Sequence, residues 1–188
     1  MLSASLAAAA VDDSRHATPA DVELGAALAR LARAERSGHA SLLAEAWQRL
    51  TRCYRALDER PTALAALEQA LRWARGSGAS DQALDLQCEL VELLAEHARA
   101  EDHHERGAGR PLRERARDLV FDAARRAARC ADPRWEVTVL LRLADVLDGF
   151  GDRDDATLLQ VRALKLTVGV DYEAGAPRAE DAARLRVH

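Results

Sequence analysis

Aromatic residues and strand-like runs are scarce in this chain. Aromatic side chains make up 4% of its 188 residues although 48% are hydrophobic, so alanine, leucine and valine must supply most of the core. Alanine and leucine are the strongest helix formers on propensity scales. The longest strand-like run, Val139–Leu141, lies within a helical spacing of apolar residues. The composition therefore predicts an all-α fold and one domain.

Cysteine and long apolar runs are also scarce. The three cysteines have no close pair and lie on expected apolar helix faces, so we expect buried thiols in a reducing compartment at Cys53, Cys88 and Cys130. No apolar run is long enough to cross a membrane. The short apolar stretch near the first residue has no basic segment before it, unlike a signal peptide. We therefore expect a cytoplasmic chain with a disordered or frayed N-terminal segment 1–18 and no membrane partner.

Charge of one sign is not concentrated anywhere. The net charge is −4, and acidic residues interrupt the arginines between Arg110 and Arg129. A nucleic-acid binder needs a basic face or stripe, which this interleaving does not provide. We expect a solvated helix surface there and no nucleic-acid partner.

Catalytic and metal-binding motifs are missing. No nucleophile elbow, glycine-rich phosphate loop or HExxH sequence is present, and Ser77 lies in a Gly-Ser-Gly helix breaker. Three histidines, His97, His103 and His104, lie among acidic residues, and imidazole and carboxylate groups together can bind zinc. Such a polar run beside glycines is, however, more often a solvated loop. We therefore expect no enzymatic activity, no cofactor and no metal.

Apolar residues recur at spacings of three and four, which is typical of helices packed on one face. Thr18–Pro19 and Asp132–Pro133 each combine a capping residue with a proline suited to the first helical position. The polar, glycine-ended stretch 99–110 predicts a long loop. The sequence thus predicts a helical domain over 19–168, followed by a tail or connector helix over 169–188.

One set of apolar steps occurs twice. The best-patterned stretch, Ala44–Ala74, has apolar residues 0, 1, 4, 7, 8 and 11 positions after Ala46, and the same steps after Val139 are all apolar. A polar turn follows each set, and then a second helix opens on a small residue, Ala63 or Ala156.

This pattern resembles the tetratricopeptide repeat, a helix–turn–helix unit of about 34 residues. In the first repeat its slots are filled in order by Trp47, Leu50, Thr51, Tyr54, Ala63, Leu67 and Ala70. In the last repeat they are filled by Leu140, Leu143, Ala144, Leu147, Gly151, Ala156 and Ala163. The middle repeat fits poorly, because Gln87 is polar at a core slot and Ala63 lies too far from Leu84. The resemblance implies an α-solenoid of antiparallel helix pairs in a right-handed superhelix; a plain helical bundle is the alternative.

The resemblance also implies a concave groove lined by the first helix of each repeat. The residues expected to face it are Glu45, Gln48, Arg52, Arg55, Gln82, Asp85, Glu89, Glu92, Thr138, Leu141, Asp145 and Asp148. A merely solvated side chain is the commoner explanation for any one of them, but together they are acidic with a basic end. Such a groove favours a peptide with basic residues. Family members that hold the acidic end of a chaperone use a Lys/Asn clamp, which Gln48 and Arg52 do not provide.

The leading hypothesis is a non-enzymatic, cytoplasmic protein–protein interaction scaffold that binds a peptide or partner protein in this groove, with 99–110 as a second contact. The alternative is a regulatory input module of a bacterial signalling protein that precedes a diguanylate cyclase or a DNA-binding output domain. The segment from Arg162 to His188 loosely resembles the connector helix after such modules. A homodimer formed through the 170–188 tail is a third possibility.

Overall fold

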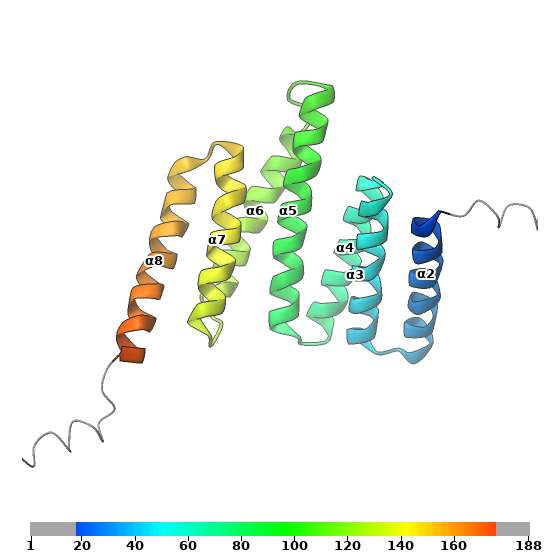
Figure 1. Cartoon of the computed structure of the whole chain (residues 1–188), viewed down its shortest axis with the longest axis horizontal. Helices are drawn as coiled ribbons and strands as arrows, with labels where there is room; N and C mark the ends of the chain where they lie inside the picture. Colours follow the sequence, from blue (N-terminus) through cyan, green and yellow to red (C-terminus); the bar gives the residue numbers. More distant parts are fainter. Residues whose placement is uncertain (1–17, 176–188) are drawn as a thin grey trace, which may run out of the picture. The chain divides into compact units, whose positions relative to one another are not determined.

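The structure is a computed structural model that describes residues 18–175, with side chains described as far as Gly169. This part of the chain consists of helices and short turns and contains no strand, which confirms the predicted all-α class (Figure 1). The helices are α2 (Pro19–Ser37), α3 (Ala40–Ala56), α4 (Arg60–Gly76), α5 (Ser80–His104), α6 (Arg110–Ala127), α7 (Pro133–Phe150) and α8 (Arg153–Gly175).

The helices group into two compact units. Unit 1 ends at Leu86 and holds α2, α3, α4 and the first turns of α5. Unit 2 begins at Gln87 and holds the rest of α5 together with α6, α7 and α8. Each unit has its own packing.

The first helix of unit 1 begins where the capping pattern predicts. The Thr18 hydroxyl accepts a hydrogen bond from the Asp21 amide at 3.2 Å, and the Asp21 carboxylate accepts one from the Thr18 amide at 2.8 Å. The side-chain bond to Thr18, followed by the backbone one, lowers the pKa of Asp21 below its usual value. This reciprocal capping box satisfies amides that the first turn of a helix leaves without partners.

Unit 1 is held together by small apolar side chains. Within it α2 packs on α3 and α3 packs on α4 (Figure 1). The buried cluster consists of Ala27, Leu31, Ala34, Leu43, Ala46, Leu50, Cys53 and Ala66, with Leu24, Trp47 and Tyr54 packed against it. Trp47 and Tyr54 are therefore packing residues, as the repeat pattern predicts. Leu28 of α2 lies outside this cluster and is 46% exposed.

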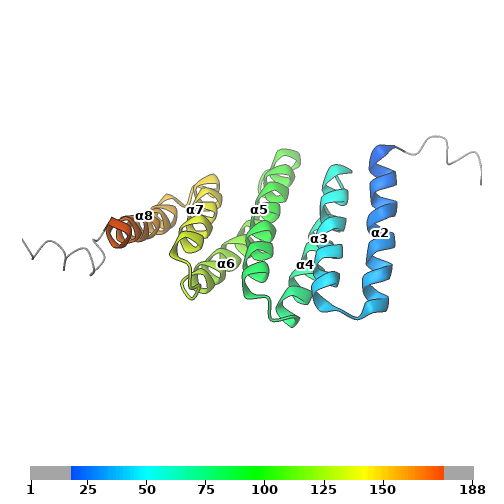
Figure 2. The same cartoon turned by 60° about the horizontal axis from the view of Figure 1, so that its bottom comes forward.

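In unit 2 the helix α6 lies behind α5 and α7 in the view of Figure 1 and below them in that of Figure 2, and α7 packs on α8. A buried glutamine joins α5 to α6, because Gln87 Nε2 donates to the Leu119 carbonyl at 3.1 Å and to the Asp122 carboxylate at 3.0 Å. Burial alone would raise the pKa of Asp122, but the hydrogen bonds from Gln87 and Arg126 lower it below its usual value. The polar residue at a core slot is thus fully buried and hydrogen-bonded.

The predicted loop over 99–110 is wrong for its first half, because α5 continues to His104 and only 105–109 connect it to α6. Two local contacts stabilise the extra turns. The Arg99 guanidinium donates to the Ala95 carbonyl at 3.2 Å, and His97 Nε2 lies 3.1 Å from the Glu101 carboxylate. Pairs four residues apart support a helix even where its surface is polar throughout.

The short connection is closed by one carboxylate and one glycine. Asp102 accepts hydrogen bonds from the amides of Gly107 at 3.2 Å and Gly109 at 2.9 Å, and it pairs with Arg113 on α6. A Cβ atom on Gly109 would lie 2.1 Å from the Ala98 carbonyl oxygen. Only glycine therefore lets the start of α6 approach α5 this closely.

A turn at Gly151 joins the last two helices. Gly151 ends α7 with a φ of +84°, a left-handed conformation that favours glycine. Arg117 of α6 pairs with Asp152 beside this turn, and the hydrogen bond with that carboxylate raises the pKa of the guanidinium.

Two sequence expectations need correction at the ends of helices. The helix α8 runs on to Gly175, past the predicted boundary at 168, and the remainder of the tail lies outside the described residues, as do residues 1–17. Cys53 and Cys88 are buried as predicted, but Cys130 follows α6 and is only half-buried.

Candidate functional site

A cleft of about 310 Å³ separates α5 from α7 in unit 2. Its lining residues are Glu92, Ala95, Glu96, Arg99, Arg142, Asp145, Val146, Gly149 and Phe150. The structure thus brings two predicted groove residues, Glu92 on α5 and Asp145 on α7, into one hollow. Val146 and Phe150 are half-buried and provide apolar walls between the charged groups.

One ion pair bridges the two helices of this cleft. Arg142 Nε and Nη2 donate to the two carboxylate oxygens of Glu92 at 2.8 and 3.2 Å, which is a bidentate pair. Both side chains remain about one-third exposed. Glu92 is therefore already paired across the cleft, and Asp145 is the predicted acidic residue of the cleft that lies open to solvent.

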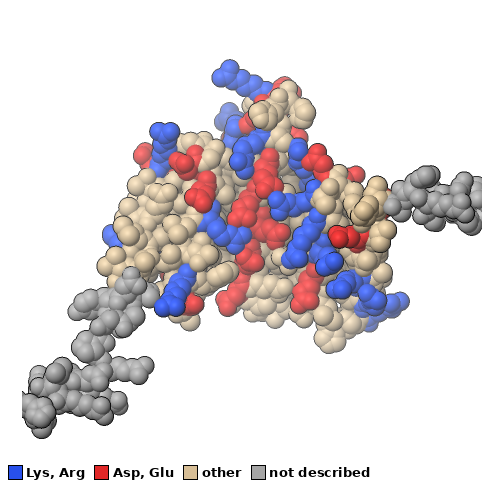
Figure 3. All heavy atoms as spheres, viewed as in Figure 1, with Lys and Arg blue, Asp and Glu red and all other residues tan. Residues whose placement is uncertain are grey.

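Acidic side chains also follow α5 along its length. In Figure 3 the acidic atoms form a band over this helix. They recur at spacings of three and four, which places them on one side of the helix: Asp81, Asp85, Glu89, Glu92 and Glu96. This band contains three of the predicted groove residues, and Asp81 and Glu96 extend it in either direction.

On α7 the predicted groove residues all lie on the outer surface. Leu141 is 45% exposed, and Asp145 and Asp148 are exposed in the turns that follow it. Thr138 is exposed as well, but its hydroxyl donates to the Arg134 carbonyl at 3.0 Å within the helix. An apolar side chain and two carboxylates therefore share this side of α7.

In unit 1 the predicted residues of α3 are also at the surface. Glu45, Arg52 and Arg55 are exposed, and Gln48 is half-buried. The two predicted residues from the first turns of α5, Gln82 and Asp85, are half-buried.

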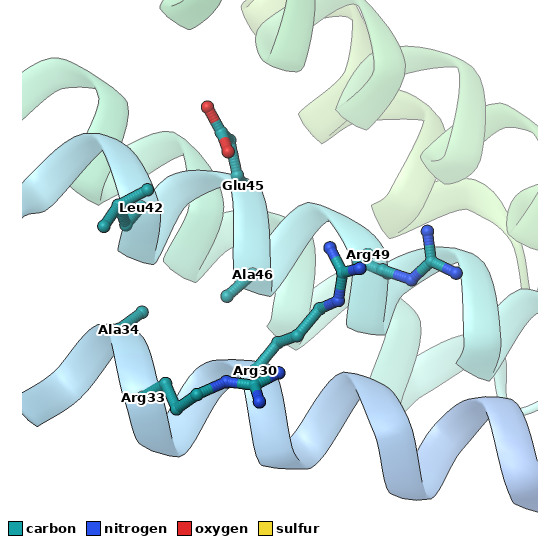
Figure 4. Close-up of a pocket in the computed structure, with 7 residues that line it drawn as sticks. All are labelled: Arg30, Arg33, Ala34, Leu42, Glu45, Ala46 and Arg49. Atoms are coloured by element: carbon teal, nitrogen blue, oxygen red, sulfur yellow. The ribbon is translucent and has the colours of Figure 1, made fainter.

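A second pocket, of about 290 Å³, lies between α2 and α3 in unit 1. It is lined by Arg30, Arg33, Ala34, Leu42, Glu45, Ala46 and Arg49 (Figure 4). Only Glu45 of these was predicted as a site residue. Arg30 and Arg33 are three positions apart on α2, a spacing that indicates a shared face, but nothing in the sequence shows that this face meets Arg49 of α3.

The histidine-rich segment at the end of α5 is part of the helix. His97 lies against Glu101, while His103 and His104 are exposed in the last turn of α5. Within residues 18–175, no three side chains of histidine, cysteine, aspartate or glutamate gather in a way that would hold a metal ion.

No protein-family model, curated protein or solved structure matches this chain. Over the part that the structure describes, no helix has both the length and the apolar character needed to span a bilayer. The acidic cleft of unit 2 and the arginine-lined pocket of unit 1 are therefore the candidate binding sites of this chain.

Proposed function

We propose that this chain is a helical-repeat module of the tetratricopeptide kind, which binds a peptide or a partner protein and catalyses no reaction. The burial of its repeat slots supports this proposal. In the first repeat Leu50, Ala63, Leu67 and Ala70 are at most 1% exposed. In the last repeat the buried slots are Leu140, Leu143, Ala144, Leu147, Ala156 and Ala163. Residues that a repeat needs for packing are thus buried in both places.

The order of packing supports a solenoid of antiparallel helix pairs. Sequential neighbours pack on each other within each unit, as α2 does on α3 and α7 does on α8. A helical hairpin with one apolar side buries that side by stacking on the next hairpin. A right-handed superhelix is what the resemblance implies for such a stack.

The cleft between α5 and α7 is the observation that supports the proposed ligand, which is a peptide segment with basic residues. Lysine and arginine side chains combine an apolar stem with a cationic head. In this cleft the stem would lie along Val146 and Phe150, and the head would reach the carboxylate of Asp145. Asp148, one turn further along α7, would attract a second cation.

Arg142 gives this cleft its selectivity. Because the guanidinium of Arg142 holds Glu92 in a bidentate pair, a ligand cation has to compete for that carboxylate. Asp145 and Asp148 therefore provide the stronger attraction, and an acidic ligand would meet both their repulsion and the acidic band of α5.

Charge reversal on α7 tests this function. We expect the Asp145→Lys, Asp148→Lys double variant to bind a fluorescein-labelled peptide of lysine and leucine about tenfold or more weakly, as measured by fluorescence anisotropy. The matched control is Glu105→Lys, Asp118→Lys, which makes the same change of net charge at exposed sites outside the cleft. Equal affinities of the two double variants would contradict the assignment of the cleft.

The apolar outer face of α8 favours a second candidate function, a regulatory input module joined through this helix to an output domain. Leu158, Val161, Leu164 and Val168 are 66%, 43%, 64% and 62% exposed, and their spacing places them on one side of the helix. A terminal helix of a repeat stack usually has a polar outer face. An output domain packed on α8 would cover these side chains.

Two measurements distinguish the occupants of this face. A reading frame that continues past the codon of His188 into a cyclase or a DNA-binding domain would support the input module, and a stop codon there would contradict it. Light scattering of the chain alone would reveal a homodimer, the other way to cover α8; replacing Leu158 and Leu164 by serine should then yield monomers.

A further inference from the structure

The pocket between α2 and α3 gathers positive charge over an apolar floor. Arg30 and Arg33 lie on α2, and Arg49 lies on α3 (Figure 4). Arg30 reaches from α2 toward α3 across the opening. Ala34 and Ala46 form the floor, where α2 and α3 are in contact.

The arginines of this pocket have no carboxylate partner among the residues that the structure describes. Within residues 18–175, neither Arg30, Arg33 nor Arg49 forms an ion pair. In unit 2, by contrast, arginines are paired with carboxylates, as Arg142 is with Glu92 and Arg162 is with Glu136. Three cations around one pocket repel each other. An anion that enters the pocket is attracted to all three, and it also reduces the repulsion between them, so both effects favour its binding.

The guanidinium group suits carboxylate ligands in particular. Its planar array of donors matches the two oxygens of a carboxylate, which allows bidentate pairing. Glu45 is the one acidic residue among those that line the pocket, and it projects from α3 beside Leu42 (Figure 4). Its charge weakens the attraction for an anion without cancelling that of the three arginines.

We propose that this pocket binds an acidic segment of a polypeptide, with glutamate or aspartate side chains on the arginines and an apolar side chain over Leu42. This site lies in unit 1 and selects the charge opposite to that proposed for the cleft of unit 2. The proposal therefore goes beyond the proposed function, and either can fail without the other.

The apolar part of the pocket favours a polypeptide over other anions. Leu42 is 45% exposed and forms one wall, and Ala34 and Ala46 are buried beneath the opening. A peptide can fill such a hollow with a leucine or valine beside its carboxylates, whereas a nucleic-acid backbone has no apolar group to place there. A long polyanion would also be repelled by the net charge of −4 that the chain carries.

The test uses the full chain and a fluorescein-labelled peptide of glutamate and leucine, with binding followed by fluorescence anisotropy. We expect the Arg30→Gln, Arg33→Gln, Arg49→Gln triple variant to bind about tenfold or more weakly than the unsubstituted chain. All three side chains are exposed, so the replacements leave the core intact. The matched control removes three exposed arginines outside the pocket, at Arg72, Arg106 and Arg129, and should change the affinity less than about twofold.

A variant of the opposite sign strengthens the test. Glu45→Gln removes the carboxylate found among the described residues that line the pocket, so it should tighten binding of the acidic peptide about twofold to threefold. Unchanged or weaker binding by this variant, or equal losses in the two triple variants, would overturn the proposal. So would the absence of saturable binding to the unsubstituted chain.

The competing anions are further outcomes of the same experiment. A single-stranded oligonucleotide or a vesicle with anionic lipid should displace the labelled acidic peptide poorly. If either competitor displaces it as efficiently as unlabelled peptide does, and if this displacement requires the three arginines, the assignment to a polypeptide is overturned. Binding of the lysine and leucine peptide should survive in the Arg30, Arg33, Arg49 triple variant. Binding of the acidic peptide should survive in Asp145→Lys, Asp148→Lys, so failure of one site is distinguishable from failure of the other.

Discussion

The buried glutamine of α5 allows a sharp test of how unit 2 is held together. Gln87→Met keeps the length and helix propensity of the side chain but removes its amide. Two hydrogen bonds are then lost, those to the Leu119 carbonyl and to the Asp122 carboxylate. The apolar replacement stays buried in a core of leucine, valine and alanine, so packing changes little.

The expected cost at pH 7 is about 2 kcal/mol. A hydrogen bond to a charged group contributes about 1.5–3 kcal/mol and one to a neutral carbonyl about 1 kcal/mol. Part of this loss is regained, because the Asp122 side chain is 34% exposed and can bind water in place of the amide. For a chain of this size, about 2 kcal/mol lowers the midpoint of thermal unfolding by about 4–8 °C.

The pH dependence separates the hydrogen bond from a packing effect. The pKa of Asp122 is depressed in the folded chain, so its stabilising contribution is present above its ordinary value of 3.8 and is lost as the pH falls through the folded value. Without Gln87 the pKa of Asp122 rises. The variant should therefore lose most stability at neutral pH and less at a pH low enough to protonate Asp122 in both proteins.

Urea unfolding followed by circular dichroism measures these differences at neutral and acidic pH. The control is Gln160→Met at an exposed glutamine of α8, which should change stability by less than about 0.5 kcal/mol. Equal stability of Gln87→Met and the unsubstituted chain, or a loss that does not depend on pH, would refute the reasoning.

Three further outcomes follow from single positions. Gly109→Ala drives a Cβ into the backbone of α5 and should cost about 3 kcal/mol in urea unfolding, whereas Gly149→Ala has open space and should cost nothing. Thr18→Ala should speed amide hydrogen exchange in the first turn of α2 about fivefold. It should also raise the pKa of Asp21, which an NMR titration would measure. The capping contact is stabilising above the ordinary pKa of the Asp21 carboxyl, and this stabilisation is lost as the pH falls through the lowered pKa of the folded chain. Cys130, the half-buried cysteine, should react first with a thiol reagent, as mass spectrometry of the modified peptides would show; equal labelling of the buried cysteines would contradict this.

Local signals in the sequence predicted most of the helix ends. Thr18 and Asp132 are capping residues whose chemistry acts within one turn, and the structure confirms both. The end of α5 was not predicted, because no local capping or stop signal marks it. Its last turns are polar on all sides, and their stability depends on contacts such as the one from Asp102 to Arg113 on the next helix.

Contacts between distant residues account for the parts of the sites that the sequence could not reveal. Arg142 and Glu92 are 50 positions apart, and only the packing of α7 beside α5 brings them together. The same holds for the arginines of unit 1, since Arg49 joins Arg30 through the packing of α2 on α3. Periodicity predicts which side of a helix is apolar, but it does not predict which polar side meets which.

Gln87 was predictable from the sequence in its position but not in its hydrogen bonds. The departure of Gln87 from the repeat pattern was visible in the sequence, and it marked a real feature of the core. Its partners on α6 follow a connection whose length the sequence misjudged, so the hydrogen bonds could not be foreseen.

An NMR titration of the ¹⁵N-labelled chain with the lysine and leucine peptide tests the central claim most directly. We expect saturable shifts of backbone amides along the facing parts of α5 and α7, centred on Asp145, with little change in α4. Shifts confined to other helices, or no shifts at peptide concentrations that saturate the anisotropy signal, would contradict a peptide-binding cleft between α5 and α7.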